Sequence, residues 1–465
     1  MNYFQLRHPH APTVRQRLAV LCCVLAVAIG QAQDLPRPSI SRARDASGSF
    51  QRPYNLKLGP IALNAGAALG LEYVDNLNLS AIEKEGDLVL RPSLGISAVW
   101  QVTRLNNLSF QTSLGYTKYL SHPELDSQSV LISPDSALKF NLFIGDVKIV
   151  FSEQFSFQDD PIGEGAVSNV ATFSRFTNTV GVNALWDLND VIWSLGYNHS
   201  NLFTTGGAAT TEGSLNNNAS VLDRSTDQFT SAVFLKLAPT TGLGLEGTAA
   251  YTRYPKNSRG DSTVYSLGPF IDFQLTSYTR IILSGGYQLY SSQSGSSGID
   301  STQIGAPVGI PGISGFGLQA PRSSESRAGD SDGSGYYFTL AISHRLNRFY
   351  SDRLSIGREF QVGVLSDRSV NTFINYSSTW QLTRRFTLSS SIGYEHSEQT
   401  SQFSRSFNGA SLPDYDRVTI ALSTGYQITR KLSVGASYQF TNRFSDSPNQ
   451  DYTQTRVALQ FGYQF

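Results

Sequence analysis

Two histidines of this sequence are directly followed by a serine, the residue pair from which acid–base and nucleophilic chemistry is most often built. They occur in the stretches YNHS (197–200) and HSE (396–398). A serine hydroxyl becomes a nucleophile when a nearby histidine accepts its proton. Adjacent residues of a β-strand point to opposite faces, so neither pair can share a proton within a strand. The pattern predicts no catalytic dyad.

No other stretch supplies a catalytic or metal-binding constellation. Beyond the signal-peptide region the chain holds two further histidines, His122 and His344, and nothing around them resembles a catalytic triad or a metal cluster. The stretch DSDG (330–333) resembles the start of a calcium loop, but the acidic ligand expected further on is missing. We therefore expect a protein that is not an enzyme and that holds no metal and no cofactor.

The N-terminus has the order of a secretory signal peptide. Arg15 and Arg17 precede an apolar run, Leu18–Gly30, which is followed by small residues up to Ala32. The run is too short to span a membrane as a helix, so we assign residues 1–32 to a signal peptide. Both cysteines lie inside this run, and the exported chain is therefore expected to contain no disulfide.

Composition indicates a β-protein rather than two or three soluble domains. Of the 465 residues, 15% are charged and 11% are aromatic, with 27 Phe and 22 Tyr against one Met. Aromatic-rich, charge-poor composition favours strands over helices. The formal net charge of zero gives no electrostatic reason to expect a nucleic-acid partner.

Apolar and small polar residues alternate along many segments. In Leu432–Phe440 one face carries Leu, Val, Ala, Tyr and Phe, and the other carries Ser, Gly and Gln. A soluble sandwich would place charged residues on its outer face, whereas a neutral polar face suits the lumen of a membrane barrel. In lipid every backbone group must be paired internally, so such a sheet has to close. We predict an all-β, antiparallel, up-and-down transmembrane barrel in the bacterial outer membrane, in contact with outer-membrane lipid.

A short element recurs where strands of this pattern meet. It reads WQVTR (100–104), FQLTS (273–277), WQLTR (380–384) and YQITR (426–430). We interpret it as a tight periplasmic turn with an aromatic anchor at the interface, opposite longer extracellular loops. The pattern gives about eighteen strands, within a range of sixteen to eighteen.

The domain boundaries follow from this pattern. Residues 33–58, rich in Pro, Ser and Arg, are expected to be a disordered periplasmic extension, and residues 59–465 the barrel. The longest extracellular loop, 291–335, has an unusually apolar middle, IGAPVGIPGISGFGLQAP. This loop either folds into the lumen as a constriction or remains on the surface.

The last strand ends the chain with Phe461, Tyr463 and Phe465 on one face. It resembles the C-terminal signal by which the outer-membrane assembly machinery recognises barrels. The resemblance implies that this machinery is a partner of the chain.

The alternation also assigns charged residues to the lumen, with a slight basic excess that favours neutral or anionic solutes. These residues are Arg91, Lys139, Lys148, Arg175, Lys236, Arg280, Arg417, Arg456, Glu72, Asp87, Glu246, Asp272 and Glu359. Glu153 and Arg358 instead fall on the lipid face, which leads us to expect a bulge in each of their strands, or an error in the assigned register.

The stretch LGLEYVDNLNLS (69–80), with its Tyr-x-Asp-Asn, is similar to the opening of the β-barrel porin-2 type families. This resemblance implies an outer-membrane barrel, often linked to exopolysaccharide systems, without catalytic residues. We therefore expect an aqueous channel for polar solutes, plausibly a saccharide or exopolysaccharide. The alternative is a non-conducting scaffold whose extracellular loops bind a partner or polysaccharide.

Overall fold

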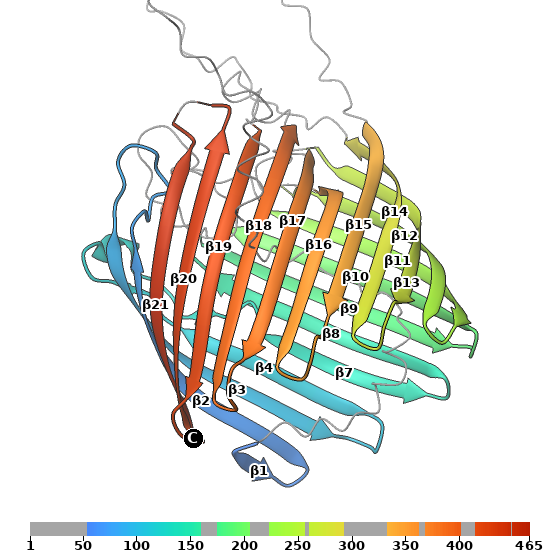
Figure 1. Ribbon diagram of the computed structural model, residues 1–465, viewed down its shortest axis with the longest axis horizontal. Coiled ribbons are helices and arrows are strands. Elements are labelled where there is room, and N and C mark those ends of the chain that lie inside the picture. Colours follow the sequence, from blue (N-terminus) through green and yellow to red (C-terminus); the bar gives the residue numbers. More distant parts are fainter. Residues whose placement is uncertain are drawn as a thin grey trace, which may run out of the picture.

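The computed structural model describes residues 54–159, 174–204, 223–255, 260–292, 333–361, 368–400, 414–447 and 449–465. They form one antiparallel sheet that closes into a barrel of eighteen long strands (Figure 1). The predicted fold class and strand number are confirmed. The predicted signal peptide lies outside the described residues, as do most of the predicted extension and of the loop 291–335.

The long strands follow one another around the wall in chain order. They are β2 (Ile61–Val74), β3 (Asp87–Gln101), β4 (Asn107–Gly115), β7 (Ala137–Ile144), β8 (Val147–Gln158), β9 (Arg175–Asp187), β10 (Val191–Thr204), β11 (Arg224–Ala238), β12 (Thr241–Arg253), β13 (Ser262–Gln274), β14 (Thr279–Ser292), β15 (Gly333–His344), β16 (Tyr350–Gln361), β17 (Arg368–Gln381), β18 (Phe386–Thr400), β19 (Tyr415–Gln427), β20 (Leu432–Ser445) and β21 (Tyr452–Gln464). Shorter elements are β1 (Leu56–Leu58), β5 (Lys118–Tyr119), β6 (Leu131–Ile132) and the 3₁₀ turn η1 (Pro123–Leu125).

The barrel closes where the first long strand meets the last. β2 pairs with β21 from Gly66 opposite Gln464 to Val74 opposite Arg456. An even number of strands brings the start of β2 and the end of β21 to the same rim, where the short turns lie (Figure 1). Closure leaves no unpaired sheet edge, which is the condition for a sheet in lipid.

The predicted periplasmic extension differs from the structure at its end. Leu56–Leu58 form β1, which pairs with the start of β2 through a tight turn. Gly59 occupies this turn with φ +58°, a conformation that glycine adopts without steric cost. The chain therefore enters the barrel as a hairpin.

The threonine hydroxyl explains why the recurring Gln-aliphatic-Thr element forms a tight turn. In all four copies this oxygen accepts hydrogen bonds from the backbone N–H groups two and three residues further on, over 3.0 to 3.3 Å; the threonines are Thr103, Thr276, Thr383 and Thr429. The threonine hydroxyl thus accepts hydrogen bonds from backbone N–H groups of the tight turn. The preceding Trp100, Trp380 and Tyr426 are each more than 40% exposed, as expected for interfacial anchors.

The outer face carries an apolar belt. Exposed leucines, isoleucines and aromatic residues occupy alternate positions of the strands, for example Leu94, Ile96 and Trp100 on β3. This exterior on a closed antiparallel barrel is that of an outer-membrane protein. Within the described residues no helix is long and apolar enough to cross a membrane.

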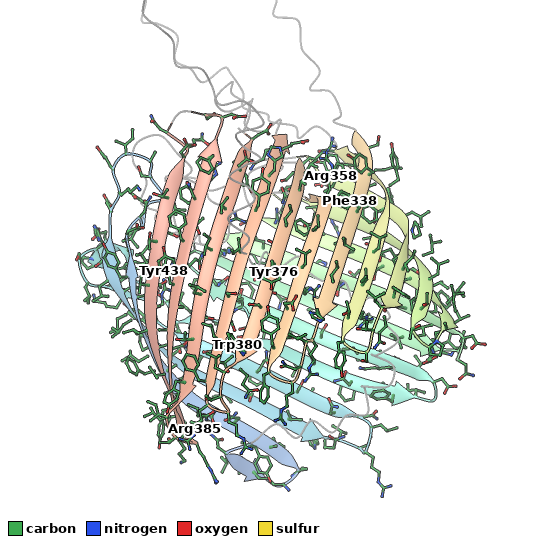
Figure 2. All side chains as sticks on the ribbon, in the orientation of Figure 1. Phe338, Arg358, Tyr376, Trp380, Arg385 and Tyr438 are labelled. Atoms are coloured by element: carbon green, nitrogen blue, oxygen red, sulfur yellow. The ribbon has the colours of Figure 1, made fainter. Side chains whose placement is uncertain are left out.

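Glu153 and Arg358 do lie on the outer face, but the expected bulges are wrong. The pairing of β8 and β16 with their neighbours runs through both positions without a shift. Each charge instead has a partner on the same face: Asn178 Nδ2 donates to Glu153 Oε1 over 3.0 Å. Arg358 lies over the rings of Tyr336 and Phe360 and 3.6 Å from Glu398, near the long-loop rim (Figure 2).

We call the line along which β2 pairs with β21 the closure seam. The motif Tyr-x-Asp-Asn continues this seam beyond the last residue pair of the two strands. Asp75 accepts the Thr455 N–H over 2.6 Å, and Asn76 Nδ2 donates to the carbonyl oxygen of Thr453 over 2.8 Å. Asn76 also bonds both backbone groups of Ser80 and is fully buried. These contacts tie the first long loop to β21.

Asn76→Ala is expected to weaken the seam because three buried backbone partners lose their hydrogen bonds, at about 1–3 kcal/mol. The temperature at which the folded form is lost in heat-modifiable gel migration should fall. Asn78→Ala is the matched control, since Asn78 bonds only within its own loop in the described residues. An equal fall in both variants would contradict a special role of Asn76.

Candidate functional site

The structure places the charges predicted for the lumen on the inner face of the wall. Arg91, for instance, alternates on β3 with Leu88 and Leu94, which are exposed on the outer face. The same alternation puts the other predicted residues inward. Some of these charged residues lie close together in the structure. Others contact residues that the sequence analysis did not assign to the lumen.

The largest group lies at the closure seam. Glu72 Oε2 lies 2.8 Å from Arg91 Nε, and Glu72 Oε1 lies 2.5 Å from Arg456 Nη2. Arg91 Nη1 also donates to Thr117 Oγ1 over 3.0 Å. Two guanidinium groups thus share the Glu72 carboxylate at the seam.

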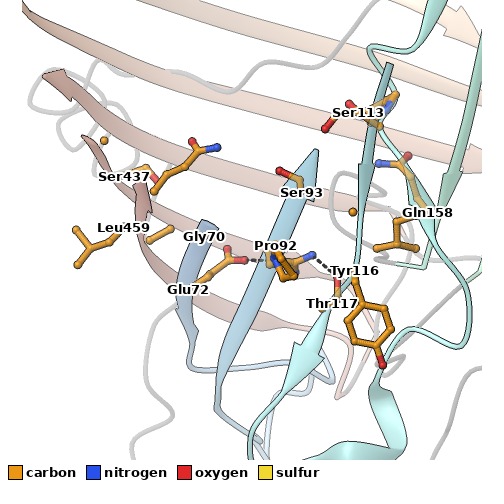
Figure 3. A pocket seen from close by; sticks show the side chains of 18 of the residues that line it. Gly70, Glu72, Pro92, Ser93, Ser113, Tyr116, Thr117, Gln158, Ser437 and Leu459 are labelled. Carbon is orange, nitrogen blue, oxygen red and sulfur yellow. Dashed lines mark hydrogen bonds and ion pairs between the residues drawn. The ribbon is translucent and has the colours of Figure 1, made fainter. Parts of the chain in front are cut away.

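Glu72 and Arg91 line a cavity of about 500 Å³ on the inner wall (Figure 3). Its other walls combine small polar residues from both sides of the seam, among them Ser93, Ser113 and Ser437, with apolar residues such as Ile132 and Phe157. Charged groups beside neutral hydroxyls give a wettable surface that can exchange hydrogen bonds with a polar solute.

A second group of charges surrounds Arg417, and the sequence reasoning predicted Arg417 but missed its partners. Glu395 Oε2 lies 3.1 Å from Arg417 Nε, and Tyr415 donates to Glu395 Oε1 over 3.1 Å. Arg443 pairs with Arg417 across the two strands and lies over the Tyr415 ring, 4.8 Å from its centroid. The alternation of Leu432–Phe440, continued to Ser445, would have placed Arg443 inward.

Two further ion pairs stand near the short-turn rim. Asp272 receives Arg280, a pair among the predicted residues, and Asp187 lies 2.7 Å from Lys236 Nζ. Arg280 and Arg353 line a second cavity, of about 560 Å³, at this end of the inner wall. Sequence reasoning missed Asp187 because it was assigned to a turn.

The remaining predicted charges do not gather at one point. Lys148 lies over the Phe143 ring, 5.5 Å from its centroid. The other residues are spread around the wall on separate strands: Lys139, Arg175, Glu246 and Glu359. Charged side chains are therefore distributed over the inner face. Among the described residues they form no catalytic constellation.

Residues 116–136, which we call the mouth segment, fold against the inner face at the long-loop rim. Leu125 of η1 packs on Val74 and Val89, and Leu77 and Tyr119 complete this apolar cluster. Val74 and Val89 point inward by the alternation of β2 and β3. The sequence reasoning treated this segment as an ordinary extracellular loop, although its buried Leu and Tyr were a signal.

Carboxylates hold the mouth segment in place. Asp87, which is 3% exposed, accepts the N–H groups of Ser121 and His122 over 2.9 and 3.0 Å, and His122 Nδ1 lies 3.2 Å away. Burial by itself raises the pKa of Asp126, but hydrogen bonds from Lys118 and the Tyr119 N–H outweigh it and hold this pKa below its ordinary value. The Asp126 anchor is therefore ionised at neutral pH.

An apolar cluster covers the inner wall nearer the short turns. Ile192, Phe234 and Phe270 are at most 1% exposed, and the two rings stack with centroids 5.8 Å apart. Each ring lies over a glycine of β12: a Cβ on Gly242 would meet Phe234 Cζ at 1.9 Å, and one on Gly244 would meet Phe270 Cζ at 2.2 Å. The glycines leave room for the rings to lie flat on the sheet.

The two histidine–serine pairs are divided between the faces of their strands. His199 Nδ1 lies 2.8 Å from Asp227 Oδ1, and His396 Nδ1 lies 2.9 Å from Asp416 Oδ1, both on the outer face. Ser397 lies on the inner face with Ser369 and Asn371. Among the described residues no group of His, Cys, Asp and Glu could hold a metal ion.

Neither a protein-family model nor a curated protein matches the sequence. The chain is similar to solved barrels at 9–10% identity: OpdK of Pseudomonas aeruginosa (TM-score 0.41, covering 87% of this chain and 99% of that one), OccK2 of the same organism in complex with glucuronate (0.44, 87% and 98%) and a BenF-like porin of Pseudomonas fluorescens (0.43, 87% and 99%). These values carry no conclusion about solute or family. The porin-2 resemblance therefore stays a prediction.

Gly242→Ala is expected to destabilise the barrel by about 1–3 kcal/mol, because the new methyl group forces Phe234 out of its position. Gly247→Ala, on the outer face of the same strand, is the control, since its Cβ meets nothing closer than 3.5 Å. Unfolding of both variants by urea in lipid vesicles measures the difference. Equal midpoints would show that the ring does not depend on the glycine.

Proposed function

We propose that this protein is an outer-membrane channel through which polar solutes cross by diffusion. The observation that carries the proposal is the inner face, where charged and hydroxyl side chains line separate cavities near the seam and near the short-turn rim. A barrel of sixteen to eighteen strands is wide enough to enclose an aqueous channel. A wall built only to fill space would instead be apolar and interlocked.

The solutes that fit best are neutral or anionic. Two arginines share Glu72 at the seam, and Glu395 receives Arg417 beside Arg443. Fixed charge on a pore wall concentrates solutes of opposite sign. Serine, threonine and glutamine on the same face exchange hydrogen bonds with hydroxyl groups, which supports a saccharide as cargo.

The finer assignments rest on sequence resemblance. Passage of exopolysaccharide follows from the likeness of residues 69–80 to the porin-2 type families. Recognition by the barrel-assembly machinery follows from the last strand, in which Phe461, Tyr463 and Phe465 are all more than 40% exposed on one face. The alternative function is a closed scaffold whose long loops bind a partner or polysaccharide.

The deciding experiment is single-channel recording of the refolded chain, without residues 1–32, in a planar bilayer. A second variant lacks residues 293–332, and a third carries Leu125→Ser to loosen the mouth segment. Steady openings of the parent protein are expected, with larger conductance in whichever variant removes the constriction. Silence of all three proteins, each shown to be folded by heat-modifiable migration, would leave the scaffold as the function.

Charge selectivity provides a second prediction. Glu72→Gln leaves two arginines at the seam without their counter-charge and should raise the anion-to-cation permeability ratio by about twofold, whereas Arg91→Gln should lower it by a similar factor. Reversal potentials in a potassium chloride gradient measure both shifts. Arg385→Gln in a short turn is the control and should leave the ratio unchanged (Figure 2). Shifts of the same sign in the first two variants would contradict the assignment.

A further inference from the structure

The outer face carries a groove that the channel function does not use. It is an open depression of about 880 Å³ that runs across β9–β14. Its floor is made of the small outward residues Ser231, Gly247 and Ala249. A smooth apolar belt would not contain such a depression.

Large side chains form the walls of the groove. Phe229 and Tyr265 stand on either side of Ala249 in the strand register, and Leu267 stands beside Gly247. These three side chains are each 55% or more exposed. The Tyr197 ring packs on Phe229 with centroids 4.8 Å apart and stiffens this wall. The result is an apolar groove on the lipid-facing surface of the barrel, with a shape that an acyl chain can fill.

A polar cluster closes the groove at the long-loop end, one register row beyond Ala249. Asp227 accepts the Tyr197 hydroxyl over 2.8 Å and Arg253 Nη2 over 2.6 Å, with His199 Nδ1 at 2.8 Å. Arg253 also lies over the Tyr251 ring, and the Tyr251 hydroxyl donates to Asp261 over 2.8 Å. A molecule bound in the groove would therefore contact both hydrogen-bond donors and carboxylate acceptors at the long-loop end of the groove.

The charges of this cluster favour a hydroxyl-rich headgroup. Among the described residues, Asp227 and Asp261 face one arginine, Arg253, whose side chain is 53% exposed. A phosphate would be repelled by the two carboxylates. Sugar hydroxyls instead donate to carboxylates and accept from guanidinium and tyrosine, and a sugar ring can stack on an aromatic face.

The barrel contains a second cluster of this kind beside larger outward residues. Tyr394 donates to Asp416 over 2.6 Å, and His396 Nδ1 lies 2.9 Å from the same oxygen. The next outward residues on β19 are Val418, Ile420 and Leu422, in place of the small residues that follow the first cluster. The Tyr–His–Asp head therefore also occurs without these small residues, so Ser231, Gly247 and Ala249 of β11 and β12 are a separate feature.

We propose that the groove and its polar head bind one acylated saccharide, a glycolipid, on the outer surface of the barrel. The acyl chain lies over Gly247 and Ala249, between Phe229 and Leu267. The saccharide lies at the long-loop rim, against Asp227 and Arg253. This site is independent of the lumen, so its loss leaves conductance unchanged.

The test is native mass spectrometry of the whole barrel, released from nanodiscs that contain equal amounts of a glycosyl diacylglycerol and a phosphatidylcholine with the same acyl chains. The parent protein is expected to retain the glycolipid with about tenfold preference, equal to about 1.4 kcal/mol. Gly247→Phe fills the floor without a backbone clash, because its Cβ has only ordinary contacts. Gly247→Phe and Arg253→Gln should each bring the preference close to one.

Ala436→Phe, on the outer face of β20, is the matched control and should keep the preference of the parent protein. Equal retention of both lipids by the parent would overturn the proposal, as would a preference that survives Gly247→Phe. A dimer that Gly247→Phe dissociates would overturn it in favour of a second copy of the chain. Single-channel conductance of the folded variants separates these outcomes from a failure of the channel itself.

Discussion

The need to pair every backbone group inside a bilayer governs this structure. Lipid offers no hydrogen-bond partner, so the sheet has to close, and closure requires the first and last strands to meet. Much of the polar chemistry follows from this demand. Glu72, Arg91 and Arg456 join across the seam, and Asp75 and Asn76 continue the joint above the last strand pair.

Alternation made the class of fold predictable from sequence. A period of two fixes which side chains face inward, so the orientation of Arg91 or Arg417 follows once the strand is recognised. The threonine turns were predictable for a similar reason, because their chemistry is local to a few residues. The alternation also placed Glu153 and Arg358 correctly on the outer face. The bulges that we inferred from that placement do not exist.

What the sequence did not reveal depends on contacts between distant segments. Phase alone cannot show that Glu395 receives Arg417 or that Asp187 receives Lys236, since these pairs join different strands at a particular height. The mouth segment was missed for the same reason: Leu125 is buried only because β2 and β3 present apolar residues to it. The groove likewise requires Ser231 and Gly247 to become neighbours through register.

The seam also joins residues at very different separations along the chain. Glu72 and Arg91 belong to the two strands of the first long hairpin, whereas Arg456 lies in the final strand, nearly four hundred residues later along the chain. The final strand therefore brings a second guanidinium to Glu72 at the same joint where it pairs with the backbone edge of β2. The closed barrel thus differs from an open sheet in the charge around Glu72 as well as in its backbone pairing.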